Sequence, residues 1–245
     1  MATKIIIWRK PSWLIIIATV ILVFFFSYLG IWQLQRAEIK NQILLENERR
    51  KTSDPQELLL PIDDPATLRF QRIRLQGKFL SARQFVLDNK IHKHQVGYNI
   101  LTPFLLNNAN VVVLVDRGWV PLGASRANLP EITIDEQPRS IMGSVYVPFG
   151  EPYHLGDIDN GETSWPRLIQ YLDLGALEAR LKLRVLPFTL LLATNQDGGF
   201  TTEWALFSFT PKRHLAYAVQ WFALAITVLI VFVLLHVKRS NSKEA

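Results

Sequence analysis

Two long apolar segments lie at opposite ends of this chain, and roughly 180 residues with a mostly polar pattern lie between them. The first covers residues 12–34 and the second covers residues 214–237. At about 1.5 Å of rise per residue, each segment is long enough to cross a hydrocarbon layer roughly 30 Å thick as a helix. The pattern therefore predicts a helical membrane hairpin that holds one folded domain, residues 35–213, on a single side of the membrane.

The central domain mainly shows the two-residue period of half-buried strands. In residues 72–79, Ile73, Leu75 and Phe79 alternate with charged or amide side chains. Residues 97–106 and 111–120 are apolar runs that flank Asn107–Asn110, which predicts a hairpin. Other expected elements are strands over 84–88, 140–147 and 185–192, a turn at Asn89–Lys90, a helical extension over 37–51, and a short amphipathic helix carrying Leu174, Leu177 and Leu181. The expected fold class is membrane α+β, with two terminal transmembrane helices around one mainly antiparallel, barrel-like β domain that has few short helices.

Basic residues flank both apolar segments on their outer sides. They are Lys4, Arg9, Lys10, Lys238, Arg239 and Lys243. Because basic residues near a span resist translocation, the tails 1–11 and 238–245 are predicted to be cytoplasmic and the central domain periplasmic, in a multi-pass inner-membrane protein. A cleavable signal peptide is the alternative for the first segment, but bulky Phe24–Phe26 stand where small residues should prepare cleavage.

Composition and charge exclude several classes of function. The formal net charge is +6, but the two tails hold six basic residues against Glu244, so the rest of the chain is nearly neutral. This distribution argues against a nucleic-acid-binding domain and favours tails that lie on anionic lipid. The chain has no cysteine, which excludes disulfides, thiol catalysis and cysteine-based metal sites.

Sequence motifs of common enzymes are missing, and the expectation is that the protein is not an enzyme. There is no Walker loop, dinucleotide-binding turn, HExxH or G-x-S-x-G. His92 and His94 would share one face of a strand, where two imidazoles can bind a metal. The alternative is an exposed basic turn, which Lys90 and Lys93 favour because they oppose a cation.

His214 lies where the second apolar segment begins. Thr210 can serve as N-cap and Pro211 as the first helical residue, so His214 is expected in the first turn, beside water. The helix N-terminus and the neighbouring basic residues disfavour imidazolium, and a neutral imidazole is a competent metal ligand, including for haem iron. Tyr217 and Trp221 follow on the same helical stripe. The alternative is an aromatic belt with an interfacial histidine.

The end of the first apolar segment should meet the same membrane face. Gly30, Gln33 and Arg36 are spaced along one side of a helix, with Trp32 beside them. A small Gly lets two helices approach closely, and Gln220 in the second segment can form a hydrogen bond with the other span or with a helix of another protein. The alternative is a plain intramolecular hairpin.

These residues resemble a known family, the Surfeit locus protein 1 family. The similar segments occur in the same order along nearly the whole chain: Leu29–Arg36, Arg72–Phe79, Leu101–Phe104, Val113–Pro121 and His214–Phe222. The resemblance implies an assembly factor for haem-copper cytochrome c oxidase, which binds haem a and assists its insertion into subunit I. It also implies haem a synthase and other oxidase assembly factors as further partners, besides the lipid bilayer.

In bacterial members of that family, the histidine at the start of the second span is the proposed haem ligand, and it corresponds to His214. The chain departs from the family at Asp116, where members often carry Asn, and at Arg213, where some eukaryotic members have Asn. The missing targeting sequence before the first span is expected of a bacterial inner-membrane member.

The resulting hypothesis gives each site residue a role. His214 is the axial ligand of the haem iron, and Trp32, Tyr217 and Trp221 pack on the macrocycle. Basic side chains lie near the propionates: Arg36, Lys212 or Arg213. The competing hypotheses are an interaction scaffold that binds the oxidase subunit without haem, and a membrane-tethered periplasmic hydrolase.

The flanking charges generate a prediction about topology. A reporter that is active only outside the cytoplasm should be active when fused into the Asn107–Asn110 turn and silent when fused after Ala245, because the basic tails resist translocation. Measuring both fusions in the same strain checks the orientation. The reverse pattern would contradict it.

Overall fold

The apolar ends of the chain form two long helices, α1 (Trp13–Lys51) and α3 (Pro211–His236). The computed structural model describes residues 4–8, 10–107, 109–123, 130–149, 158, 164–204 and 209–241. Two short strands, β1 (Lys4–Trp8) and β10 (Val237–Asn241), pair in antiparallel register next to the helices. The chain divides into two compact units: residues 1–45 with 206–245, and residues 46–205.

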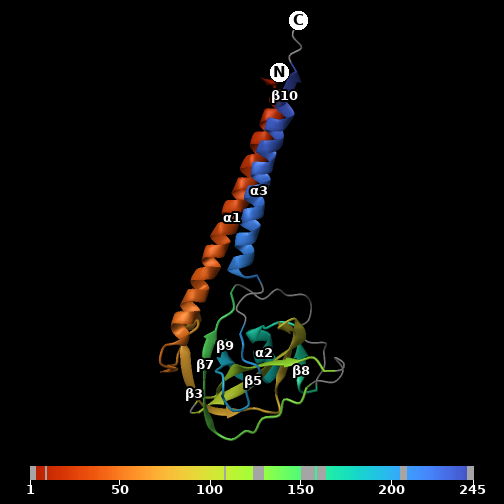
Figure 1. Ribbon diagram of the computed structural model, residues 1–245. Coiled ribbons are helices and arrows are strands. Elements are labelled where there is room, and N and C mark those ends of the chain that lie inside the picture. The colour runs from red at the N-terminus through yellow and green to blue at the C-terminus, as the bar shows by residue number, and fades with distance from the viewer. Residues whose placement is uncertain are drawn as a thin grey trace. The chain divides into compact units, whose positions relative to one another are not determined.

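Helices α1 and α3 pack side by side in antiparallel directions (Figure 1). Gly30 makes their close approach possible, because a Cβ atom there would lie 2.7 Å from the ring of Phe222. Phe26 and Trp221 stack with their ring centroids 5.9 Å apart. The small residue at the helix interface, predicted from the sequence, is thus confirmed.

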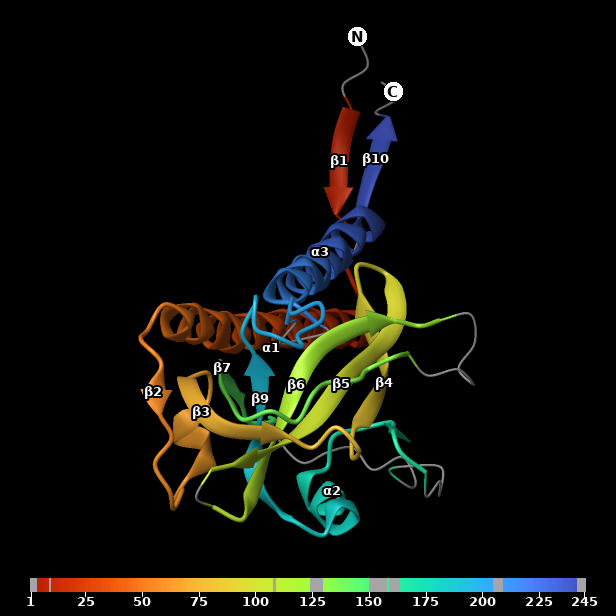
Figure 2. The same cartoon turned by 90° about the horizontal axis from the view of Figure 1, so that it is seen from below.

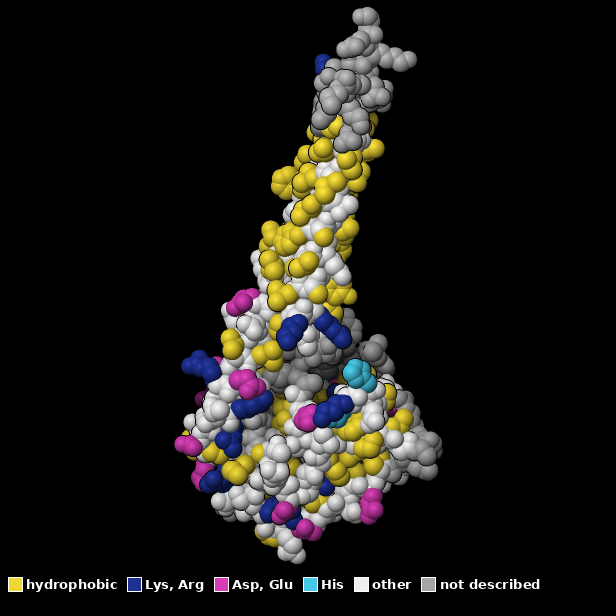
Figure 3. Space-filling model, in the orientation of Figure 1, with side chains coloured by type: hydrophobic (Ala, Val, Ile, Leu, Met, Phe, Trp, Pro, Cys, Tyr) yellow, Lys and Arg dark blue, Asp and Glu magenta, His cyan; other side chains and the backbone are white. Residues whose placement is uncertain are grey.

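Large apolar side chains cover the outer face of the helical pair, as Figure 3 shows. Phe24 is 72% exposed and Leu234 is 68% exposed. Both helices are long and apolar enough to cross a membrane. Apolar side chains in this number and with this exposure are unfavourable in water and favourable in lipid.

The second unit is built on a closed β-barrel. Its elements are β2 (Gln56–Glu57), the 3₁₀ turn η1 (Pro65–Leu68), β3 (Arg72–Phe79), β4 (Phe85–His92), β5 (Gln95–Leu106), β6 (Val111–Pro121), β7 (Arg139–Tyr146), β8 (Arg167–Ile169), α2 (Leu174–Leu181) and β9 (Arg184–Leu192). The strand order is β2-β3-β7-β9-β6-β5-β4-β8, and an extra pairing of β3 with β5 closes a ring of β3, β7, β9, β6 and β5 (Figure 2). Pairing is mainly antiparallel, as predicted, although β6 and β9 are parallel.

The two faces of β6 contribute to different clusters of the core, which explains its continuous apolar sequence. Val113 and Val115 pack with Phe79, Phe104 and other buried residues of the ring strands. Val112 and Leu114, on the opposite face, pack in the cluster that includes Leu177 of α2. A strand with two buried faces loses the polar alternation of an exposed strand.

The predicted turn at Asn89–Lys90 is wrong, because β4 continues to His92. A register shift between Leu87 and Lys90 interrupts the pairing with β5, and Asn89 takes a positive φ of 58° there. The chain reverses at Lys93 and His94, which also have positive φ angles. The residues at this position do favour a positive φ angle, as the sequence indicated, but the positive φ occurs in a β-bulge and not in a chain reversal.

Tail residues Arg9 and Lys243 and turn residue Asn108 lie outside the described residues.

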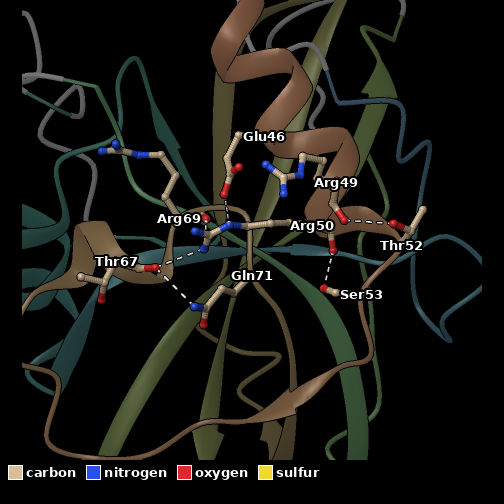
Figure 4. Close-up of polar contacts among 8 residues, drawn as sticks. All are labelled: Glu46, Arg49, Arg50, Thr52, Ser53, Thr67, Arg69 and Gln71. Carbon is tan, nitrogen blue, oxygen red and sulfur yellow. Dashed lines mark hydrogen bonds and ion pairs between the residues drawn. The ribbon is translucent and has the colours of Figure 1, made fainter.

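The last turn of α1 is attached to the segment around η1 by Arg50 (Figure 4). Its Nη1 donates to the carbonyl oxygens of Thr67 at 3.1 Å and Arg69 at 2.9 Å, and its Nε forms an ion pair with Glu46. Ser53 Oγ donates to the carbonyl of Arg50 just after the helix ends. These bonds satisfy carbonyl groups that a helix end would otherwise leave free.

A bulge in β6 holds the segment that follows β9. Gly118 has φ +120°, and the register between β5 and β6 shifts at this point. Phe200 N donates to the carbonyl of Arg117 at 2.7 Å, and Trp119 N donates to that of Thr201 at 2.8 Å. Gly118 therefore lies at a bulge where the backbone of the segment after β9 approaches closely.

Arg117, in the same bulge, is only 1% exposed. Its guanidinium donates to Gln84 Oε1 at 2.9 Å and to the carbonyl oxygens of Ile132 and Gly198. Burial, with a contribution from nearby Arg139, lowers the pKa of Arg117 to about 10. A buried guanidinium bound mainly by neutral acceptors stabilises the structure only while these hydrogen bonds are complete.

Asp116 is also buried, next to Arg117 in sequence. Burial raises its pKa to about 7, although hydrogen bonds from Asn99 and from Gly118 N, and the charge of Lys90, act in the opposite direction. The carboxylate therefore takes up a proton near neutral pH, much more readily than an exposed aspartate.

Replacing Gly118 with Val should sharply lower the amount of folded protein. The new Cβ would lie 2.7 Å from the carbonyl oxygen of Thr201, at a φ angle that side chains with a β-branch rarely adopt. We expect a loss of at least about 3 kcal/mol of unfolding free energy. Thermal unfolding in detergent measures it, and Gly175→Ala in α2, where there is space, is the control. An undiminished amount of folded protein would contradict the prediction.

Replacing Asp116 with Asn should stabilise the protein at alkaline pH. Since the pKa of Asp116 is raised from 3.8 to about 7, its contribution is fully present below about pH 4 and is lost as pH rises through 7. The variant should gain roughly 2–4 kcal/mol of unfolding free energy at pH 8.5 and nothing near pH 4. Denaturant unfolding across this pH range measures the gain, with exposed Asp63→Asn as the control. A gain that does not grow with pH would contradict the prediction.

Candidate functional site

The candidate site lies between facing turns of α1 and α3, near the start of α3. Gln33 of α1 and His214 of α3 meet there, with Oε1 of the amide 2.7 Å from Nδ1 of the imidazole. His214 is only 8% exposed. The prediction that His214 lies beside water is therefore wrong, because α1 covers the first turn of α3 on this side.

The second ring nitrogen of His214, Nε2, is buried and forms no hydrogen bond within the part of the chain that the structure describes. Because the atom facing Nδ1 is an amide oxygen, which only accepts, a neutral imidazole that makes this bond carries its hydrogen on Nδ1 and a lone pair on Nε2. Histidines that bind metal ions commonly show this arrangement, with one nitrogen donating to an acceptor and the other free to bind.

Phe209 covers the imidazole. Its ring meets that of His214 edge to face with centroids 4.5 Å apart, and it stacks with Tyr217 at 5.6 Å. Lys40 Nζ donates to the carbonyl oxygen of Phe209 at 2.8 Å. The guanidinium carbon of Arg213 lies 5.9 Å from the same ring. The Phe209 ring is therefore a direct neighbour of the imidazole and is itself held by Lys40 and Tyr217.

The other predicted site residues lie farther along the same two helices. Trp32 and Tyr217 are exposed, and the guanidinium carbon of Arg36 lies 5.7 Å from the centre of the Trp32 ring. Trp221 instead stacks on Phe26, and its Nε1 is buried without a hydrogen-bond partner among the described residues. The structure thus brings His214, Tyr217 and Arg213 together around Phe209, and it gives Trp32 and Trp221 other immediate neighbours.

Basic side chains gather at this end of the helical pair. They are Arg36, Lys40, Lys212 and Arg213, and Glu38 is the acidic residue on the same turns of α1. The excess positive charge suits an anionic group at the edge of an apolar layer, such as a carboxylate or a phosphate.

Sequence reasoning missed Phe209 and Lys40. Lys40 lies one turn beyond Arg36 on α1, and Phe209 comes just before Pro211, so both are near predicted site residues along the chain. Helical spacing could have identified Lys40, because it continues the row of Gln33 and Arg36 along one side of α1. Nothing in the sequence indicated that Phe209 would turn back onto the imidazole.

The structure also bears on two other hypotheses from the sequence, the metal site at His92 and the partner of Gln220. His92 Nε2 lies 3.7 Å from Glu203, and no group of three or more potential metal-binding side chains occurs among the described residues. Gln220 is exposed on α3, so its amide does not lie in the interface with α1. Of its two predicted partners, a helix of another protein is the one that this position favours.

Comparisons with known proteins agree on one family. The model of the SURF1 family matches residues 20–226. A protein of Rickettsia felis named SURF1-like protein is 26% identical, with 84% of this chain and 89% of the relative covered. A SURF1-like protein of Monosiga brevicollis is 21% identical over 87% of this chain and 84% of the relative. The Saccharomyces cerevisiae protein named cytochrome oxidase assembly protein SHY1 is 26% identical over 38% of this chain and 24% of its own length.

Proposed function

This chain belongs to the SURF1 family, and we propose that it is a non-enzymatic assembly factor of haem-copper cytochrome c oxidase. In this role it binds haem a through His214 and assists haem insertion into subunit I. The similarity to a yeast protein named as a cytochrome oxidase assembly protein supports the role in assembly. The single observation that supports haem binding is the buried, unpartnered Nε2 of His214, whose opposite nitrogen is already bound by Gln33.

The proposed location is the inner membrane, with α1 and α3 spanning it, both tails in the cytoplasm and the barrel in the periplasm. The apolar length and the exposed apolar surface of both helices support the spanning role. His214 then lies where α3 enters the membrane. At this level a hydrophobic cargo can pass to an integral subunit by moving within the plane of the membrane. Haem a synthase and other oxidase assembly factors are the expected further partners.

The residues present fit a haem cargo. The ligand is a neutral imidazole held between apolar helices, and an apolar macrocycle there is shielded from water by lipid and by aromatic side chains. Trp32 and Tyr217 are exposed beside this region and available to contact the cargo, whereas Trp221 would have to leave Phe26. Arg36, Lys212 and Arg213 supply positive charge for the propionates.

A scaffold that binds the oxidase subunit without haem is the second candidate. Two observations favour it: Phe209 covers His214, and Gln220 exposes an amide within the apolar part of α3. An amide in hydrocarbon is unfavourable unless a neighbouring helix binds it, so a partner helix is expected at this position.

Removing the imidazole tests the proposed function. His214→Gln, which keeps a hydrogen-bonding side chain in a buried position, should abolish the Soret absorbance of protein purified from membranes that produce haem a. His214→Ala should do the same but with some loss of protein, because truncating a buried side chain costs about 1–3 kcal/mol. A pyridine-haemochrome spectrum measures the haem.

The matched control is His92→Ala in the barrel, which should leave the haem content unchanged. Full haem content in both His214 variants would contradict the ligand assignment and favour the scaffold.

A further inference from the structure

Gln33 is the polar residue of α1 that faces the candidate ligand. Small buried residues on both helices hold it in a closely packed position. It has Gly30 one turn before it and Ala37 one turn after it, both buried. Ala218, one turn after His214, is 1% exposed. Small buried residues bring the two backbones close together on both sides of the contact, so the amide and the imidazole meet from fixed positions.

The contact itself determines which ring nitrogen is available. Gln33 Oε1 lies 2.7 Å from Nδ1, and an amide oxygen accepts but cannot donate. Without this acceptor, the hydrogen of a neutral imidazole is free to move to Nε2, which removes the lone pair that binds a metal ion. His214 is buried, so a water molecule does not readily replace this acceptor.

We infer that Gln33 is a positioning residue for the haem ligand: it fixes the Nδ1–H tautomer and the ring orientation of His214, so that Nε2 is held ready to bind iron. This inference rests on the proposed function. Acceptors behind metal-binding histidines typically change metal affinity by 10–100-fold when they are removed. Gln33 never touches the iron; it acts through the imidazole.

The first test uses the haem-free protein, in which the role of Gln33 is separate from any cargo. Nitrogen NMR of protein labelled at its histidines, in detergent, reports which nitrogen of His214 carries the hydrogen, and His214→Gln assigns the signal. The parent protein should show hydrogen on Nδ1, and Gln33→Leu should shift the population toward Nε2–H. A parent protein with hydrogen on Nε2, or a tautomer that Gln33→Leu leaves unchanged, would overturn the inference.

The second test is a titration with haem a, with haemin in parallel. Gln33→Leu should bind haem 10–100-fold more weakly, whereas Gln33→Glu, which restores an acceptor of the same length, should recover binding. The glutamate should also make the haem midpoint potential more negative than in the parent, because a stronger acceptor makes the imidazole a stronger donor to iron. A residue that only pairs two helices would affect protein stability but would not move the potential in this direction.

Gln35→Leu is the matched control, since Gln35 is exposed on the same helix two residues away. It should leave the tautomer, the affinity and the potential unchanged. If His214→Gln abolishes haem binding while all Gln33 variants bind like the parent, the positioning role fails and the proposed function remains. If His214→Gln still binds haem, the proposed ligand fails, and the positioning role of Gln33 fails with it.

Discussion

A polar side chain buried between apolar helices needs a partner, and this constraint shapes the helical unit of the protein. Gln33 and His214 satisfy each other across the two helices, at 2.7 Å, where the small residues Gly30, Ala37 and Ala218 bring the backbones together. The pair satisfies only one of the two imidazole nitrogens. A structure that satisfied every polar group would be more stable. The unpaired Nε2 therefore lowers the stability of the fold, and positions that do so are commonly functional.

The ring of Phe209, which contacts the imidazole, lies outside both helices. Phe209 belongs to the short segment before α3, and it is held by Lys40 through its backbone and by stacking with Tyr217. A side chain at a helix start can change rotamer without unpacking either helix. The ring that contacts the imidazole can therefore move locally while α1 and α3 stay packed.

The fold was predictable from the sequence to the extent that it depends on local pattern. Apolar length indicated α1 and α3, the two-residue period indicated β3, and two apolar runs around an Asn-rich turn indicated the β5–β6 hairpin. The parallel pairing of β6 with β9 and the closure of β3 onto β5 join residues far apart in sequence, and no local pattern records such pairings. For the candidate site, helical spacing placed Gln33 and His214 at the same level, but the burial of His214 depends on the packing of α1 and on Phe209, which the pattern does not show.

The choice of an amide as the partner of His214 also agrees with a transient role. A carboxylate behind a metal-binding histidine makes the imidazole a stronger donor and holds the metal more tightly, whereas an amide oxygen orients the ring with less effect on its basicity. A carboxylate at this depth would also carry a desolvation cost that a neutral amide avoids. In a protein proposed to release its haem to another subunit, orientation without strong retention is the property that the ligand needs, and Gln33 provides the acceptor for it.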